Sequence, residues 1–209
     1  MDLNIIPGVL LLVMLIFSAP VDAGNKSPSY TQDKAVKTTT PLNLSWVDFN
    51  EELESKAIFD YITTVFKKVN RQDAQLISKS LVKFGQKYKL DPKFAAALIA
   101  RESGFDKEAV SVTGAKGLGQ IKGFNFSDLG IKNPFDVAQN TKATTQYLKQ
   151  MITKWGSESE KISLGLASYY NGYTAVKRVK GQVDQKTSNY VNDILAYYND
   201  IKELRVSLD

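Results

Sequence analysis

The strongest constraint on the fold is a run of seven residues, from Phe94 to Ala100, without one polar side chain. Asp91 and Pro92 precede the run, and these residue types favour the N-cap and the first position of a helix. Gly104 follows it and is typical of a helix C-terminus. The pattern predicts a helix that is apolar on every side, and such a helix must lie in the middle of a domain.

Further helices are predicted where apolar residues recur at steps of three and four. They cover 45–70, 73–88, 137–155, 161–170, 175–179 and 188–204. The first begins at a weak capping signal, Ser45 with Asp48, and Arg71 and Gln72 mark the break after it. The glycine-rich segment 104–135 is expected to form loops, short turns and at most a minor β element. No segment shows the sustained alternation of strands, so the chain is expected to be mainly α.

The N-terminal part of the chain resembles an export signal followed by a linker. Val9 to Phe17 is an apolar stretch too short to span a bilayer, and Val21-Asp22-Ala23 supplies the small residues of a cleavage site. The first residues include no Lys or Arg, so an uncleaved membrane anchor is the alternative. Residues 24–43, rich in Lys, Ser, Thr, Pro and Gly, are expected to be a flexible linker. We therefore divide the chain into a signal peptide (1–23), a linker (24–43), an extra N-terminal helix (44–71) and a main domain (72–205).

Composition restricts the chemistry of this main domain. The chain has no cysteine and no histidine, which excludes disulfides, thiolate zinc sites, cysteine nucleophiles and the Ser-His-Asp triad. Acid/base chemistry must come from carboxylates, tyrosines or lysines. Loss of residues 1–23 would remove Asp2 and Asp22 and raise the formal charge from +5 to +7. A basic exported domain suits an anionic partner such as cell wall, membrane surface or nucleic acid, although solubility alone explains the charge equally well.

Glu102 is the first candidate for a catalytic group, because it ends the most apolar helix of the chain. Desolvation at the edge of the core and the negative end of the helix dipole both raise the pKa of a carboxyl group there. A carboxyl that stays protonated near neutral pH can donate a proton to a leaving oxygen. A solvated glutamate at a helix end is the plainer alternative.

The segment after Glu102 changes this balance. Gly114, Gly117 and Gly119 permit close approach of the backbone to a ligand, and Gln120 brings an amide to the same place. The segment lacks the Lys-Ser/Thr ending of a phosphate-binding loop, and no strand precedes it. Nucleotide binding is therefore not expected.

Together these residues resemble the soluble lytic transglycosylase family, whose fold is similar to goose-type lysozyme. The family pattern is a Glu-Ser pair, a Ser nine residues after the Glu, and Gly-Ala-x-Gly-Leu-Met-Gln-Ile. Glu102-Ser103, Ser111 and the segment 114–121 match it in order and spacing. Tyr170-Asn171-Gly172 resembles the family's Ala-Tyr-Asn-Ala-Gly motif, and Asn189-Tyr190-Val191 resembles its closing helix. The resemblance covers about residues 72–200.

Four departures from the pattern are visible. Gly119 replaces the usual Met, Lys122 stands near a commonly apolar position, Tyr169 replaces an Ala, and one small residue is missing after Asn171. We expect the first two to alter how a sugar packs in the groove without touching the carboxylate.

The resemblance implies an exported enzyme of the bacterial periplasm or cell envelope that acts on peptidoglycan glycan strands. Its single acid/base, Glu102, would cleave the bond between N-acetylmuramic acid and N-acetylglucosamine and leave a 1,6-anhydro sugar. Substrate-binding residues would be Ser111, Gly117, Gln120, Tyr170, Asn171 and Tyr190, with Tyr170 hydrogen-bonded near Glu102. We expect a monomer with no metal, cofactor or nucleic-acid partner. The 45–70 helix either braces the domain or docks a partner from envelope machinery.

Two other functions remain open from the sequence. A hydrolytic lysozyme would need a second carboxylate to hold water. The nearby candidates are Asp106, Glu108, Asp128 and Asp136, of which Asp136 is expected to cap the helix at 137, and none is paired with Glu102 by a motif. A binding module that grips glycan without cutting it would not require a carboxyl at position 102.

Overall fold

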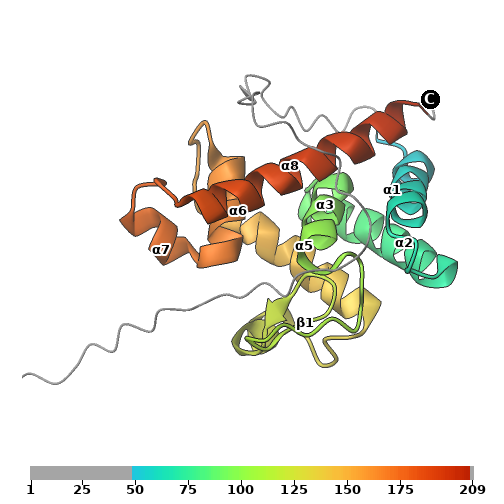
Figure 1. Ribbon diagram of the computed structural model, residues 1–209, viewed down its shortest axis with the longest axis horizontal. Coiled ribbons are helices and arrows are strands. Elements are labelled where there is room, and N and C mark those ends of the chain that lie inside the picture. Colours follow the sequence, from blue (N-terminus) through green and yellow to red (C-terminus); the bar gives the residue numbers. More distant parts are fainter. Residues whose placement is uncertain (1–48, 208–209) are drawn as a thin grey trace, which may run out of the picture.

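The computed structural model describes residues 49–207. Helices dominate this part of the chain, as predicted (Figure 1). In chain order the elements are α1 (Glu51–Val65), α2 (Arg71–Tyr88), α3 (Pro92–Ser103), β1 (Ala115–Lys116), β2 (Ile121–Lys122), η1 (Gly123–Asn125), α4 (Phe126–Leu129), α5 (Val137–Thr153), α6 (Lys161–Asn171), α7 (Tyr173–Arg178) and α8 (Gln185–Val206). The expected mainly α class is confirmed.

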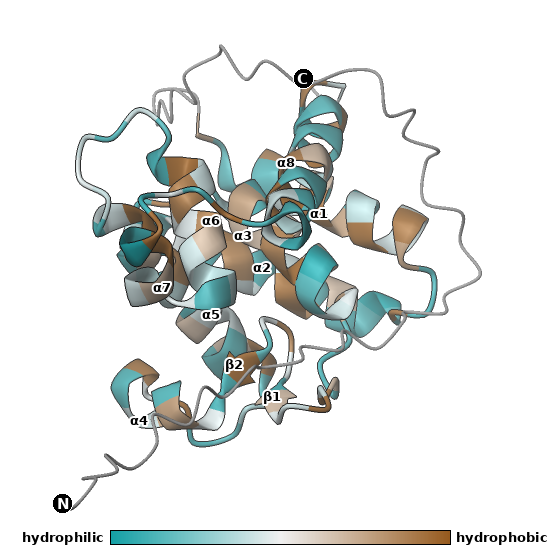
Figure 2. Cartoon of the chain, turned by 60° about the vertical axis from the view of Figure 1, so that its left-hand side comes forward, coloured by the Kyte–Doolittle hydropathy of each residue, from teal (hydrophilic) through white to brown (hydrophobic). Residues whose placement is uncertain are grey.

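The central helix is α3, the one predicted from its apolar run. The Asp91 side chain accepts the Lys93 backbone N–H at 2.9 Å, Pro92 opens the helix, and Gly104 ends it with a left-handed φ of 59°. Every residue from Phe94 to Ala100 is at most 5% exposed. Helices α1, α2, α5 and α8 contact it, and Figure 2 shows hydrophobic stretches of α3 in the middle of the surrounding helices.

The structure differs from prediction at the boundary between α1 and α2. Arg71 and Gln72 are the first residues of α2 and not a break, because the Asn70 side chain caps that helix by accepting the Asp73 N–H at 2.8 Å. The turn between the two helices lies at 66–70. Helix α1 begins at Glu51 behind Asn50, whose side chain accepts two backbone N–H groups.

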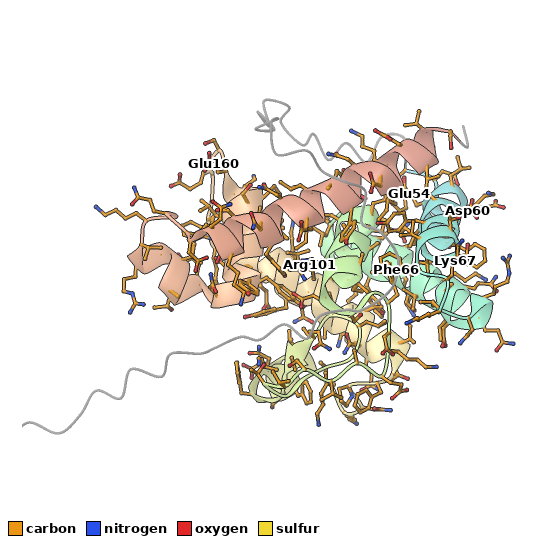
Figure 3. All side chains as sticks on the ribbon, in the orientation of Figure 1. Glu54, Asp60, Phe66, Lys67, Arg101 and Glu160 are labelled. Atoms are coloured by element: carbon orange, nitrogen blue, oxygen red, sulfur yellow. The ribbon has the colours of Figure 1, made fainter. Side chains whose placement is uncertain are left out.

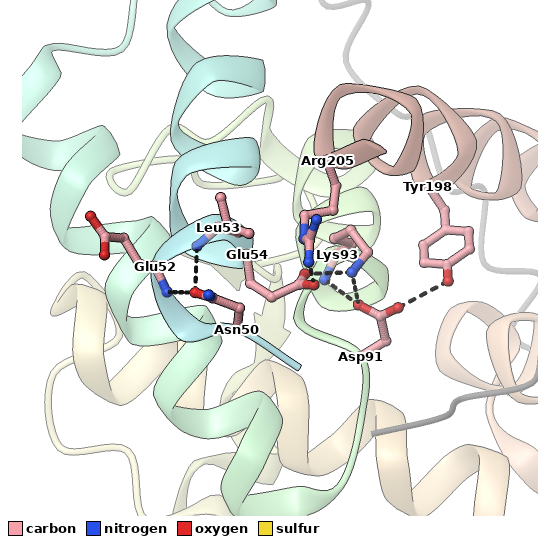
Figure 4. A network of polar contacts seen from close by, with 8 residues as sticks. All are labelled: Asn50, Glu52, Leu53, Glu54, Asp91, Lys93, Tyr198 and Arg205. Atoms are coloured by element: carbon pink, nitrogen blue, oxygen red, sulfur yellow. Dashed lines mark hydrogen bonds and ion pairs between the residues drawn. The ribbon is translucent and has the colours of Figure 1, made fainter. Parts of the chain in front are cut away.

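Helix α1 shares the core of the main domain. Ala57, Ile58, Tyr61 and Ile62 are buried, and the helix contacts α2, α3 and α8. Its Glu54 is joined to the first turn of α3 and to the last turns of α8 by buried charges (Figure 4). Of the two roles expected for this helix, its buried face performs the bracing one.

The buried charges form one network across three helices. Lys93 pairs with Glu54, and its Nζ lies 3.1 Å from Asp91 Oδ1. Arg205 Nε lies 3.2 Å from Glu54 Oε1, and the Tyr198 hydroxyl donates to Asp91 at 2.9 Å. A buried charge is stable only when it is paired and hydrogen-bonded. The network therefore fixes α1 and the end of α8 against the start of α3.

The glycine-rich segment forms the small β element and is anchored to α5 by one side chain. Strands β1 and β2 are antiparallel, with Ala115 opposite Lys122. The buried amide of Asn140 donates to the carbonyls of Lys116 (3.2 Å) and Pro134 (2.8 Å) and accepts the Gly119 N–H at 2.8 Å. Because three loop groups converge on one amide, the loop is held in place beside α5.

The predicted signal peptide, the linker and the Ser45–Asp48 cap lie outside the described residues. Within 49–207, no helix combines the length and apolar character needed to cross a bilayer.

Candidate active site

Glu102 lies in the last turn of α3, where the buried helix meets a half-buried surface. The hydroxyl of Tyr190, from α8, donates a hydrogen bond to its Oε1 at 2.5 Å. Burial raises the pKa of Glu102 from 4.5 to about 7, against opposing effects of the Tyr190 bond and of the charges of Arg101 and Lys122. Desolvation therefore outweighs three interactions that favour the ionised form. The carboxyl carries its proton for much of the time near neutral pH.

Tyr190 is a hydrogen-bond donor that is itself buried, with 2% of its surface exposed. Burial and the charge of Glu102 raise the pKa of its phenol well above 10, so it keeps its proton. Its ring stacks on that of Tyr170, with centroids 4.5 Å apart and planes at 23°. The Arg101 guanidinium carbon lies 5.5 Å from the centre of the Tyr190 ring. Aromatic and cationic contacts thus fix the ring whose hydroxyl holds Glu102.

Sequence reasoning gave Tyr170 the role that the structure gives to Tyr190. Tyr170 was expected to hydrogen-bond near Glu102, whereas its ring supports Tyr190 and lies 6.0 Å from Lys186 Nζ. For Tyr190, core packing and a place in the cleft were both open. Its ring is packed in the core, and its place in a cleft stays a prediction. The side chain of Asn171, also predicted for the site, donates to Thr187 Oγ1 at 2.7 Å and so ties α6 to α8.

The loop residues predicted to touch sugar are used to shape the loop itself. Ser111 Oγ accepts the Ala115 N–H at 3.0 Å. The Gln120 amide donates to the carbonyls of Ala109 (3.1 Å) and Gly117 (2.9 Å). At Gly117, φ is +71° and a Cβ would lie 2.2 Å from the Pro134 carbonyl oxygen, so only glycine fits. These residues hold the strand pair in position, and any contact with substrate would be additional.

Gly119, one of the departures expected to alter sugar packing, lies against Thr144 of α5. A Cβ at this position would lie 1.9 Å from Thr144 Oγ1, so α5 occupies the space of a larger side chain. The Gly119 carbonyl accepts the hydroxyl of Tyr169 at 2.7 Å, and Tyr169 packs on Tyr147 with ring centroids 5.1 Å apart. Two departures from the family pattern, Gly119 and Tyr169, therefore bond to each other. Sequence reasoning noted both and did not connect them.

Lys122, the other departure, contributes a cation beside the carboxyl. Its ammonium donates to the Thr113 carbonyl at 3.0 Å and to the Thr113 hydroxyl, and its charge lowers the pKa of Glu102. Burial, and after it the negative charge of Glu102, raise the pKa of the Tyr169 phenol well above 10. Glu102 is thus surrounded by groups from α3, β2, α6 and α8.

The four carboxylates considered as a second catalytic group are engaged or exposed elsewhere. Asp136 caps α5 by accepting the Gln139 N–H at 2.7 Å, as predicted, and Asp106 accepts the Glu108 N–H at 2.9 Å. Glu108 and Asp128 are exposed. The charges that act on the pKa of Glu102 are those of Arg101 and Lys122. Within residues 49–207, no three Asp, Glu, His or Cys side chains are grouped as metal ligands would be.

Such an arrangement has the chemistry of a proton donor and acceptor. A carboxyl with a pKa near 7 can give up its proton and take it back at little cost in free energy. The Tyr190 hydroxyl stabilises the ionised state of Glu102, because it bonds to an oxygen of the carboxylate.

Comparison with known proteins identifies this arrangement with a family. The family model of the transglycosylase SLT domain matches residues 80–192, which contain Glu102, the glycine-rich loop and Tyr190. The membrane-bound lytic murein transglycosylase F of Desulfosudis oleivorans is 33% identical over 98 residues, 46% of this chain. The protein of the same name from Erwinia tasmaniensis is 26% identical over 162 residues, 69% of this chain. The matches span 22% and 32% of those relatives.

A solved structure shows the same fold. The 70 kDa soluble lytic transglycosylase of Escherichia coli superposes with a TM-score of 0.52 at 18% identity, over 73% of this chain and 30% of that one. The family match covers more than half of the residues, and its elements meet at Glu102 in three dimensions. The chain therefore belongs to the transglycosylase SLT domain family.

Proposed function

We propose that this protein is a peptidoglycan lytic transglycosylase in which Glu102 is the single general acid/base. The observation that carries the proposal is the Glu102 carboxyl itself, buried enough to have a pKa of about 7 and bonded to Tyr190 at 2.5 Å. The relatives named lytic murein transglycosylases support the substrate class. The target is the β-1,4 bond from N-acetylmuramic acid to N-acetylglucosamine.

In the first step, protonated Glu102 gives its proton to the glycosidic oxygen. The bond from that oxygen to the anomeric carbon breaks, and the N-acetylglucosamine side leaves as an alcohol. Positive charge develops on the muramoyl ring, and the new carboxylate is stabilised by the Tyr190 hydroxyl. Backbone carbonyls and the phenols of Tyr170 and Tyr190 supply further dipoles.

In the second step, the muramoyl 6-hydroxyl attacks its own anomeric carbon while Glu102 removes the hydroxyl proton. A 1,6-anhydro ring closes, Glu102 is protonated again, and no water is consumed. An intramolecular nucleophile gains from proximity and needs no second carboxylate. The engagement of Asp106 and Asp136 in local caps supports this reaction over hydrolysis.

The remaining assignments follow from the same proposal. Ser111, Gly117 and Gln120 shape the loop that borders the glycan, while Tyr170 and Asn171 support Tyr190 and α8. The protein acts as a monomer on glycan strands in the bacterial periplasm or envelope, after export through residues 1–23. No cofactor, metal or nucleic acid takes part.

The test is the product of digestion. Purified peptidoglycan is digested with the wild type, with Glu102→Gln and with Glu108→Gln, a matched control in an exposed carboxylate. We expect muropeptides one water lighter than lysozyme products and resistant to borohydride, and no products from folded Glu102→Gln. Reducing ends would establish hydrolysis instead, and an inert wild type would establish a binding module.

A further inference from the structure

A second charged group reaches the active site through the residue next to Glu102. Arg101 Nε pairs with Asp193 Oδ2 of α8 at 2.9 Å. Among the described residues, Arg101 forms an ion pair with Asp193 and forms none with Glu102. Figure 3 shows Arg101 at the centre of the molecule, beneath α8. A guanidinium therefore lies beside the acid/base while it is bonded to a different carboxylate.

The position of this guanidinium matters for the chemistry of Glu102. Arginine binds carboxylates in strong, often bidentate pairs, and such a pair would hold Glu102 ionised. A general acid must carry a proton before it reacts. A direct Arg101–Glu102 pair would therefore oppose the first step of the proposed reaction.

Asp193 is placed to prevent that pair. It follows Tyr190 by three residues on α8, so the two side chains lie on one side of the helix. Tyr190 holds Glu102 through its hydroxyl, and its ring lies 5.5 Å from the guanidinium carbon of Arg101. One turn of α8 thus contacts both members of the Arg101–Glu102 sequence, each through a different side chain.

We propose that Asp193 is a positioning residue, which holds the Arg101 guanidinium against the Tyr190 ring and away from the Glu102 carboxyl. This inference rests on the proposed function and deepens it. Arg101 then stabilises the ionised carboxylate from a distance without capturing it. The pair also joins α3 to α8 at the site.

We expect the other charged and titratable groups around Glu102 to stay in place when this pair is changed. Lys122 of β2 is held by Thr113, and Tyr169 of α6 is bonded to the Gly119 carbonyl. On α8, Tyr190 bonds to Glu102, and Tyr197 is close enough to sense the charges of both Arg101 and Asp193. Among the described residues, none of these groups forms a hydrogen bond or an ion pair with Asp193.

Two single substitutions make opposite predictions. In Asp193→Asn, Arg101 is released and pairs with Glu102, which lowers the pKa of that carboxyl by on the order of one unit. In Arg101→Gln, a cation is lost and the pKa of Glu102 rises. Loss of the Asp193 charge alone would lower the pKa of Glu102 by the same amount whether or not Arg101 is present. Capture of Glu102 by the released Arg101 requires the fall to be much smaller in the double variant Arg101→Gln/Asp193→Asn, compared with Arg101→Gln, than in Asp193→Asn compared with the wild type.

The experiment measures the titration of Glu102 in the full protein by NMR of ¹³C-labelled glutamate carboxyls, with Glu102→Gln to assign the signal. The pH dependence of wall cleavage is recorded in parallel. In Asp193→Asn, we expect the alkaline limb of the pH profile to move to lower pH by about one unit, so that activity at a pH above the limb falls roughly tenfold. In Arg101→Gln, we expect the limb to move to higher pH. Asp193→Glu, which keeps a carboxylate to pair with Arg101, should retain the wild-type profile.

Asp60→Asn is the matched control, since Asp60 pairs with Lys56 on α1, far from Arg101 in Figure 3. No fall of the Glu102 pKa in Asp193→Asn, or an equal fall when Arg101 is already replaced by Gln, would overturn the positioning role. The NMR titration reads out this role even if the wild type cleaves no peptidoglycan, so failure of the proposed function is separately visible. If Asp193→Asn fails to fold, Asp193→Ser takes its place, because it also removes the carboxylate that holds Arg101.

Discussion

Tyr190 on α8 and Glu102 on α3 lie 88 positions apart in the chain, and the phenol hydroxyl of one donates to the carboxyl of the other at 2.5 Å. Of the helices within residues 49–207, the bond joins the most buried, α3, to the longest, α8. Its donor keeps its proton, because burial holds the pKa of the phenol far above neutral pH. The acidity of Glu102 is therefore set by desolvation against the Tyr190 hydrogen bond and the charges of Arg101 and Lys122.

Tyr190→Phe tests this balance. Loss of the hydroxyl removes an interaction that lowers the pKa of Glu102, so the alkaline limb of the pH profile should move to higher pH. Activity on the plateau should fall about 10- to 100-fold, the equivalent of roughly 1.5–3 kcal/mol for a hydrogen bond to a charged group. Rates of wall cleavage between pH 5 and 9 measure both effects.

Tyr173→Phe is the control for Tyr190→Phe, because the hydrogen bond of the Tyr173 hydroxyl within residues 49–207 goes to the Lys154 carbonyl, at 3.4 Å, and not to Glu102. The control should retain the wild-type profile. An unchanged profile in Tyr190→Phe would remove this hydroxyl from the mechanism.

The sequence was sufficient for features that depend on neighbouring residues. Asp91 and Gly104 delimit α3 as their residue types predict, and Glu102 stands at the edge of the core because the apolar run ends there. The error at Arg71 had a local remedy, since Asn70 with Asp73 three residues later is itself a capping signal.

Features that depend on distant residues could not be predicted. No periodicity shows that Tyr190, rather than Tyr170, points its hydroxyl at Glu102, because the choice depends on how α8 crosses α3. The amide of Gln120 suits a sugar as well as it suits two loop carbonyls, and only the fold shows that the carbonyls use it. Likewise, the reason for a glycine at position 119 is its contact with Thr144 of α5, which only the fold shows.

Gly119→Ala should destabilise the protein without changing its backbone preference. The added Cβ would lie 1.9 Å from Thr144 Oγ1 and 2.8 Å from Thr144 Cβ, so α5 must shift. Overpacking of this kind costs about 1–3 kcal/mol. Chemical denaturation measures the loss, and Thr144→Ala in the same chain should recover part of it.

Gly123→Ala is the matched control for Gly119→Ala, since nothing lies within 4 Å of a Cβ there. Its stability should equal that of the wild type. Equal losses at both positions would mean that steric contact with α5 is not the cause.

Lys93→Met should be among the most destabilising single changes in the chain. Lys93 and Glu54 are both buried, and removal of one partner leaves a buried charge with less compensation. Such losses cost about 3–5 kcal/mol, and Arg205 beside Glu54 favours the lower end of that range. Urea denaturation measures it. Lys56→Met, in the exposed pair with Asp60, should have little effect, and a similar loss there would contradict the role of burial.

Glu102 itself should make the wild type less stable as the pH rises. Its pKa is about 7 in the folded protein against 4.5 when unfolded, so between these values the folded state binds more protons. Stability then falls with increasing pH through this window and levels off above pH 7. The difference in pKa corresponds to roughly 3 kcal/mol when the carboxyl is fully ionised.

Glu102→Gln removes this penalty, because a neutral amide of the same shape still accepts the Tyr190 hydroxyl. The variant should therefore be inactive yet more stable than the wild type at pH 8 by up to about 3 kcal/mol, with the gain vanishing near pH 4.5. Denaturation of both proteins at pH 4.5, 6 and 8 gives the slope, and Glu108→Gln supplies the exposed control. A gain independent of pH would show that the cause is not the ionisation of Glu102, whereas a gain that grows between pH 5 and 7 locates the desolvated charge at the residue assigned to proton transfer.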